Sequence, residues 1–218
     1  MRNPEFEGIR KEIWSMMVEH PLQGSYEAVL RGEKSWKEYH EDLLKYLKSG
    51  EEEPAYFALE HVLDALRKRH KSTYQDEFWE VAERITTYYP PQDTSIAPEY
   101  LARIHQAAIQ LARNSKAITK KPIFWRTLLG TAVVDMLPPK VVEDTAKAIR
   151  HTIREGHARN DEKLAKVLRV VAEDLAEQIQ FVKDHKNLKN SELKQLWSAE
   201  EQLSIARRLL EKQKHTRT

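Results

Sequence analysis

The stretch that decides the fold covers residues 122–156 and reads PIFWRTLLGTAVVDMLPPKVVEDTAKAIRHTIREG. Prolines divide it into two segments, and proline is tolerated in the first turn of a helix but not in its interior. The first segment, 122–137, is apolar on nearly all sides, so we expect it to form the most buried helix of the protein. The second begins at Pro139, carries an apolar stripe at helical spacing, and ends before Gly156, a residue type that suits a helix C-terminus.

Signals for the start and end of helices recur along the rest of the chain. Ser35 with Glu38, and Ser72 with Gln75, have the spacing of a capping box, which marks the start of a helix. Alternation of the strand type is missing, so the pattern predicts an all-α protein, an irregular multi-helix bundle of about nine helices without a β-sheet. Outside the stretch quoted above, the expected helices cover residues 4–20, 25–31, 35–47, 54–71, 72–89, 98–114, 160–185 and 191–212.

Composition restricts the chemistry that the protein can carry. The 218 residues include no cysteine and only 6 glycines, and 32% of them are charged. Absence of cysteine excludes a disulfide framework, a thiolate zinc site, an iron–sulfur cluster and a cysteine nucleophile. No segment reaches the roughly 20 apolar residues of a membrane helix, and the N-terminus lacks the apolar core of a signal peptide. We therefore expect a cytoplasmic protein that does not contact a membrane.

Charge is distributed unequally along the chain. Residues 1–96 hold 13 Lys and Arg against 19 Asp and Glu, a net charge of −6, whereas residues 97–218 hold 23 against 15, a net charge of +8. The stretch 90–96 combines two prolines with short polar residues and is the best candidate linker. We expect an acidic helical part over 1–96 and a basic helical part over 97–218, with one continuous domain as the alternative. The positive net charge of residues 97–218 indicates an acidic binding partner.

Cations recur at helical spacing in the basic part, where no Asp or Glu occurs between Tyr100 and Val134. Residues three or four apart share a helix face, so each helix would present a basic stripe of the kind that a phosphate backbone requires. The alternative is a solvated face whose charges pair with nearby Glu. Lys147, Arg150 and Arg154 are expected to lie off the apolar stripe, so that reversing their charges would leave the fold intact. The candidate nucleic-acid-binding residues are Arg113, Lys116, Lys120, Lys121, Arg126, Lys147, Arg150, Arg154, Arg159, Lys163 and Lys166.

Tryptophans are candidates for stacking on bases, and Trp125 lies close to the basic residues 120–121. Its other neighbours are apolar, which favours a place in the core over a place on the surface. The same interpretation applies to the other tryptophans because all of them fall within amphipathic segments. They are Trp14, Trp36, Trp79 and Trp197.

Motifs of catalysis and metal binding are missing. The sequence has no GxGxxG, P-loop, GxSxG or DDxxD pattern, and its nine histidines form no HxxxH, HExxH or ExxH pair. We therefore expect neither a metal nor a cofactor. Asp135 is the exception to be tested, because it interrupts the apolar segment 122–137. A buried carboxylate paired with an arginine would mark a site, whereas a place near Pro138 would expose it to solvent at the helix end.

Three functions are compatible with these patterns. The basic part indicates a nucleic-acid-associated protein, the missing catalytic motifs and the oppositely charged halves indicate an adaptor, and Asp135 leaves a helical enzyme with an unrecognised site as the alternative. We expect a non-enzymatic subunit or adaptor of a larger assembly, with a protein partner and with RNA, DNA or another acidic partner on the basic half. Leu196, Leu203 and Leu210 recur at intervals of seven in the last helix and offer a face for an oligomer through the C-terminal helices.

Overall fold

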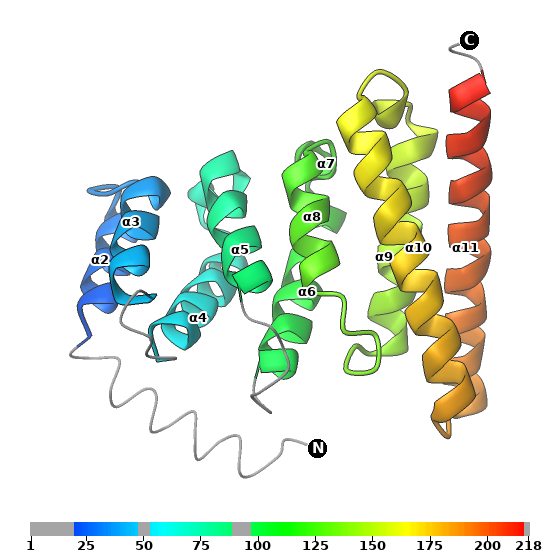
Figure 1. The fold of residues 1–218 in the computed structure, drawn as a ribbon, viewed down its shortest axis with the longest axis horizontal. Coiled ribbons are helices and arrows are strands. Elements are labelled where there is room, and N and C mark those ends of the chain that lie inside the picture. Colours follow the sequence, from blue (N-terminus) through cyan, green and yellow to red (C-terminus); the bar gives the residue numbers. More distant parts are fainter. Residues whose placement is uncertain (1–19, 48–52, 89–96, 216–218) are drawn as a thin grey trace. The chain divides into compact units, whose positions relative to one another are not determined.

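The computed structural model describes residues 20–47, 53–88 and 97–215, and within these residues it is helical without a strand, which confirms the expected all-α class (Figure 1). None of the described helices is long and apolar enough to cross a bilayer. The expected helix 4–20 and the linker 90–96 lie outside the described residues. The helices are α2 (Pro21–Arg31), α3 (Trp36–Leu47), α4 (Glu53–Lys68), η1 (Lys71–Tyr74), α5 (Asp76–Tyr88), α6 (Ala97–Asn114), α7 (Lys116–Thr119), α8 (Pro122–Gly130), α9 (Pro139–Arg154), η2 (His157–Arg159), α10 (Glu162–His185) and α11 (Asn190–His215).

Local signals in the sequence set most helix ends. Pro21 and Pro139 occupy the first turns of α2 and α9. Gly32 and Gly156 follow the ends of these helices with φ values of 75° and 80°, a backbone conformation in which glycine has no Cβ to clash. The capping box at the start of α3 is formed as expected: Glu38 N donates to Ser35 Oγ at 3.2 Å, and Ser35 N donates to the Glu38 carboxylate at 2.7 Å.

The prediction of a second capping box, at Ser72 and Gln75, is wrong. The Ser72 hydroxyl lies 2.7 Å from Nδ1 of His70 instead of accepting from the amide of Gln75. His70 thereby caps a 3-10 turn, η1, and the α-helix begins only at Asp76. A side chain that bonds its own neighbourhood in this way offers the backbone an alternative to the helix, and here that alternative is the one adopted.

The apolar segment 122–137 is not one helix, which corrects the expectation. α8 ends at Gly130, and Thr131 Oγ1 donates to the carbonyls of Thr127 and Leu128 at 3.1 Å each, so its hydroxyl takes part in closing the helix. The amide of Val134 then donates to Gln178 of α10 at 3.0 Å, outside any helical ladder. Nor is α8 the most buried helix: α4 has ten buried residues among its sixteen, and α8 has five among its nine.

The chain divides into two compact units, residues 1–100 and 101–218, close to the boundary at which the net charge changes sign. In the first unit, Trp36 is the centre of an aromatic cluster, with its ring centroid 5.0 Å from Phe78, 5.3 Å from Tyr39 and 6.2 Å from Tyr26. The buried His61 lies in the same core, 2.7 Å from Tyr39 Oη through Nδ1 and 2.9 Å from Gln23 Oε1 through Nε2.

In the second unit, α9, α10 and α11 lie side by side, and α10 packs also on α8 (Figure 1). The three leucines at intervals of seven are 1%, 0% and 3% exposed at Leu196, Leu203 and Leu210. α11 therefore uses this face against α9 and α10 of its own unit, and the leucines are not available to a second subunit, contrary to the expectation from sequence.

A buried histidine ties three segments of the second unit together. His105 of α6 is 0% exposed, and its ring nitrogens lie 3.1 Å from Thr131 Oγ1 and 3.0 Å from Thr145 Oγ1. These contacts link α6 to the end of α8 and to α9. Burial disfavours the charged imidazolium and lowers the pKa of His105 to about 4, and it lowers the pKa of His61 to about 3.

We predict that Leu128→Ala lowers the free energy of unfolding by about 2–5 kcal/mol, because the side chain is 0% exposed and its removal leaves a cavity. Leu129 is the matched control, since it is only partly buried in the same helix turn. Leu129→Ala should cost clearly less. Urea denaturation followed by circular dichroism measures both values, and equal losses would contradict this account of the core.

We also predict that the protein loses stability as the pH falls below about 6.5, the ordinary pKa of histidine. His61 and His105 recover that pKa on unfolding, so the unfolded state binds more protons at every pH between this value and the folded pKa values of about 3 and 4. Each histidine should remove up to about 1.4 kcal/mol per pH unit in this window. Urea denaturation at a series of pH values measures the slope.

His105→Gln tests the origin of this slope, because glutamine keeps a donor and an acceptor but does not titrate. The variant should be less stable at neutral pH and should have a shallower pH dependence in the second unit. The same pH slope in both proteins would show that His105 is not responsible. Asp42 and Glu143, whose pKa values are lowered to about 2 in the folded protein, add to the loss of stability below about pH 5, so the histidine slope is measured between about pH 6.5 and 5.

Candidate functional site

Several of the cations expected to bind nucleic acid are paired with carboxylates. Arg113 lies 3.3 Å from Asp144, Lys116 lies 2.7 Å from Glu155, and Lys147 lies 2.6 Å from Glu143. Although their side chains are 47% to 70% exposed, their charges are compensated locally. The first half of α9 therefore presents balanced charge and not a continuous basic stripe.

Glu143 is the reason for this balance. It is 9% exposed, and it accepts hydrogen bonds from Lys140 at 2.8 Å, from Lys147 at 2.6 Å and from Ser198 of α11 at 2.8 Å. Burial acts to raise the pKa of this carboxyl, but the three donors outweigh burial and hold the pKa at about 2. The carboxylate thus joins α9 to α11 and uses two cations of α9.

Three further candidates also have other contacts. Arg150 is half-buried and donates to Gln202 of α11 at 2.6 Å, so it belongs to the interface between the helices. Lys121 is half-buried and Arg126 is exposed, and both interact with other groups of the protein. Each of the three therefore has a contact within the protein, although the Gln202 amide does not neutralise the charge of Arg150.

The remaining five candidates are exposed and form no ion pair with any described residue. One of them, Lys120, follows α7. The other four lie where α9 ends, the chain turns through η2, and α10 begins, and η2 contacts both helices. We call these four residues the basic corner: Arg154, Arg159, Lys163 and Lys166.

Two carboxylates near the basic corner, Glu155 and Asp161, are already in use, whereas Glu162 in the first turn of α10 is exposed and has no ion-pair partner among the described residues. Glu155 accepts from Lys116 at 2.7 Å and lies 3.0 Å from His157 Nε2 and 2.8 Å from His151 Nε2. The hydrogen bond from Lys116 contributes most to holding the pKa of Glu155 at about 2. Asp161 caps α10 by accepting from Leu164 N at 2.9 Å. The four cations therefore keep their charge available to a ligand.

The burial of the tryptophans agrees only in part with the prediction. Trp36, Trp79 and Trp125 are buried as predicted, and the indole of Trp125 donates to the carbonyl of Thr119 at 2.8 Å, so it cannot stack on a base. Trp197 is wrong as a core residue, because it is 54% exposed near the start of α11. Trp14 lies outside the described residues. Only hydrophobicity and periodicity argued for burying Trp197, and neither reports which face a helix turns to its neighbours.

Asp135 lies in the turn between α8 and α9. Its side chain is 43% exposed, its carboxylate is 3.7 Å from Lys186 Nζ, and Lys186 donates also to its backbone carbonyl. This is a surface ion pair that fastens the turn to the end of α10. The arginine partner expected for a buried Asp135 is replaced by this lysine.

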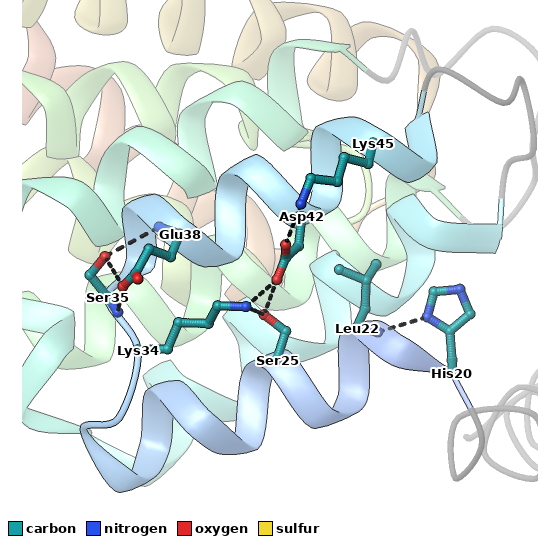
Figure 2. A network of polar contacts seen from close by, with 8 residues as sticks. All are labelled: His20, Leu22, Ser25, Lys34, Ser35, Glu38, Asp42 and Lys45. Atoms are coloured by element: carbon teal, nitrogen blue, oxygen red, sulfur yellow. Dashed lines mark hydrogen bonds and ion pairs between the residues drawn. The ribbon is translucent and has the colours of Figure 1, made fainter.

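A polar network in the first unit was not found from the sequence (Figure 2). Ser25 Oγ donates to Asp42 at 2.8 Å, and the Lys34 ammonium donates to both Asp42 and Ser25. Burial acts to raise the pKa of Asp42, but hydrogen bonds from Lys34, Ser25 and Lys45 hold it at about 2. The Asp42 carboxylate of α3 thus accepts from Ser25 of α2 and from Lys34 of the loop between the helices, so the network fastens α2 to α3.

We predict that Arg150→Glu lowers the free energy of unfolding by about 1–3 kcal/mol, because it removes the bond to Gln202 and buries a carboxylate in part. Arg154→Glu, one helical turn further and exposed, should change stability by less than about 0.5 kcal/mol. Thermal and urea unfolding measure both variants. Equal effects would show that Arg150 is not part of the α9–α11 interface.

Comparison with known proteins supplies no relative. The chain matches no protein-family model, no curated protein and no solved structure. Its function must therefore be argued from its own surface.

Proposed function

We propose that the chain is a non-enzymatic interaction protein that contacts the phosphate backbone of nucleic acid through the basic corner. The observation that supports this proposal is the group of four exposed cations, Arg154, Arg159, Lys163 and Lys166, without an ion-pair partner among the described residues. Elsewhere on α9 the protein neutralises its cations, so an uncompensated group at one turn is a local feature and not a property of the whole basic half.

Counterion release would provide the free energy of binding. Each phosphate neutralised by a Lys or Arg frees condensed cations, so the affinity falls steeply as salt is added. Lys163 and Lys166 are three residues apart and share a face of α10, which places their charges in a row along the helix. Arg159 precedes them in the turn and Arg154 ends α9, so the row continues around the corner.

Binding by these residues would be tolerant of sequence. Contacts with phosphates fix position, whereas contacts with base edges carry specificity. Asn160 is the one amide side chain next to the basic corner in sequence. The exposed aromatic residues in the described part of this unit are far along the chain from it: Phe181 lies near the C-terminal end of α10, and Trp197 lies near the N-terminal end of α11. We therefore propose that the chain supplies affinity, and that any selection of a sequence comes from a partner.

A role as a subunit or adaptor is supported by a separate observation. Phe181 is 59% exposed and Trp197 is 54% exposed. Large aromatic residues are enriched at protein–protein interfaces, where they contribute much of the binding free energy. We propose that these residues contact a protein partner. Copurification after nuclease treatment, with the wild type compared with Phe181→Ala and Trp197→Ala, tests this; a partner retained equally by all three proteins would exclude the two aromatic residues.

We predict that replacing the four cations of the basic corner by Gln weakens binding to labelled RNA and duplex DNA at low salt. On duplex DNA the slope of log affinity against log salt is about −0.9 per phosphate contacted, so the slope should decrease in magnitude by up to about 3.6. Fluorescence anisotropy titrations at several salt concentrations measure both quantities. The fold should survive because all four side chains are exposed.

The matched control removes four positive charges elsewhere. Lys37, Lys189, Lys194 and Arg208 are exposed and lie outside the basic corner, and their joint replacement by Gln gives the same net charge. The control should bind nearly as well as the wild type. Equal weakening in the two variants would show that only net charge matters, and absence of binding by the wild type at low salt would leave the protein-partner role alone.

A further inference from the structure

One side of α10 is turned away from the elements that hold this helix in the second unit. Lys183 donates to Glu200 of α11 at 2.8 Å, and Gln178 accepts from the amide of Val134, in the turn after α8, at 3.0 Å. Successive residues of a helix point about 100° apart. Phe181, two residues before Lys183, therefore points away from α11, and its side chain is 59% exposed.

Two apolar side chains and three carboxylates share this side of the helix. They recur at intervals of three or four residues, which places them on one helix face, and all five are exposed. Val170 is 42% exposed, which is unusual for an apolar residue in the middle of a helix of this unit. We call these five residues the outer face of α10: Val170, Glu173, Glu177, Phe181 and Asp184.

The outer face is acidic although it belongs to the basic half of the chain. Residues 97–218 carry a net charge of +8, whereas residues 170–185 hold four Asp and Glu against one Lys, a net charge of −3. The lysine, Lys183, is already bound to Glu200. No carboxylate of this stretch forms an ion pair with another described residue; the four are Glu173, Asp174, Glu177 and Asp184.

The surroundings of these carboxylates supply no compensating cation. Arg169, one helical turn before Glu173, forms no ion pair with it. Asp174 is half-buried beside the outer face and accepts only from the neutral amide of Gln178, at 2.7 Å, among the described residues. Burial and the charge of Glu177 raise the pKa of Asp174, whereas the bond from Gln178 acts in the opposite direction. A cation brought to this side of α10 would stabilise several carboxylates at once.

We propose that the outer face of α10 binds a basic amphipathic helix of a partner protein, which rests on the protein-partner role proposed above for Phe181. Apolar residues of the partner helix cover Val170 and Phe181, and its Lys and Arg side chains pair with the carboxylates between them. The two apolar residues are eleven positions apart, about 16 Å along the axis, so the partner helix has about three turns or more.

Charge decides between this partner and two other occupants. The same face of a second copy would bring carboxylates against carboxylates, and a nucleic acid would bring phosphates against them. Both are repelled at close range. A helix with cations flanking an apolar stripe matches the outer face in charge as well as in apolar contact.

Fluorescence anisotropy with two synthetic peptides tests the proposal on the full chain. The first peptide is a labelled helix of about 18 residues, or five turns, with Leu at intervals of three and four on one side and Lys beside it. The second has Glu in place of every Lys. The basic peptide should bind saturably and the acidic peptide should not. Absence of saturable binding by the basic peptide, or equal binding of both peptides, overturns the proposal.

Variants of the chain locate the binding. Phe181→Ala should weaken the basic peptide at least about tenfold, as for an aromatic residue central to an interface. Replacing Glu173 and Glu177 together by Gln should weaken it about threefold or more at low salt, and this difference should vanish in about 1 M salt, which screens exposed charges. All of these positions are exposed, so the fold should survive.

The matched control replaces two exposed carboxylates of α11, Glu201 and Glu211, by Gln, which changes the net charge equally. Affinity for the basic peptide should stay the same. Equal weakening in the two double variants overturns the proposal, because only net charge would then matter. A dimer of the wild type in sedimentation equilibrium that Phe181→Ala abolishes also overturns it and assigns the outer face to a second copy.

The copurification experiment described above fails independently of this one. A partner that requires Phe181 in copurification, together with no binding of the basic peptide, overturns only the basic helix as occupant. A copurified partner that does not require Phe181 excludes that residue from the partner contact and overturns the basis of both proposals.

Discussion

The buried carboxylate of Glu143 is the constraint on which the charge pattern of the second unit depends. A carboxylate that is 9% exposed must be compensated, since an unpaired charge in that position is costly. Lys140 and Lys147 supply the compensation from α9, and Ser198 supplies it from α11. The same contacts that hold the two helices together thus remove half of α9 from any basic surface. On α9 itself, the cation that stays exposed and without an ion pair among the described residues is Arg154 at the C-terminal end.

Local signals in the sequence accounted for several helix ends but not for the start of α5 or the end of α8. Pro21, Pro139, Gly32 and Gly156 act through their own backbone geometry, and the Ser35–Glu38 box closes within four residues. Long-range contacts were not predictable from the sequence. No residue near Val134 predicts that its amide donates to Gln178, 44 residues away. This bond engages the backbone outside a helix, in the segment that follows the end of α8 at Gly130.

In the candidate site, too, local patterns were predictable from the sequence and long-range contacts were not. Spacing identified the basic residues of α9 and α10 correctly as surface cations in several cases, because periodicity reports which residues share a face. It could not report that Asp144 neutralises Arg113 across 31 residues or that Gln202 engages Arg150 across 52. The network of Ser25, Lys34 and Asp42 was missed because its members come from α2, from the loop after it and from α3.

Exposure of the basic corner determines how strongly it would bind. An exposed cation such as Lys163 is well solvated when unpaired, so its binding to a phosphate gains little per contact and is screened by salt.

The size of the basic corner bears on its role. Its four cations can neutralise four phosphates at most, fewer than the roughly 6–10 contacts at which affinity falls about 10³–10⁵-fold between 50 and 200 mM salt. Four contacts give weak binding at physiological salt, but a weak surface becomes effective once another contact holds the strand nearby, because the second event is then intramolecular. The exposed Phe181 and Trp197 are suited to provide that other contact through a protein partner. A weak basic surface and a separate aromatic one are together what a subunit needs, and neither would suffice for a protein that acts alone.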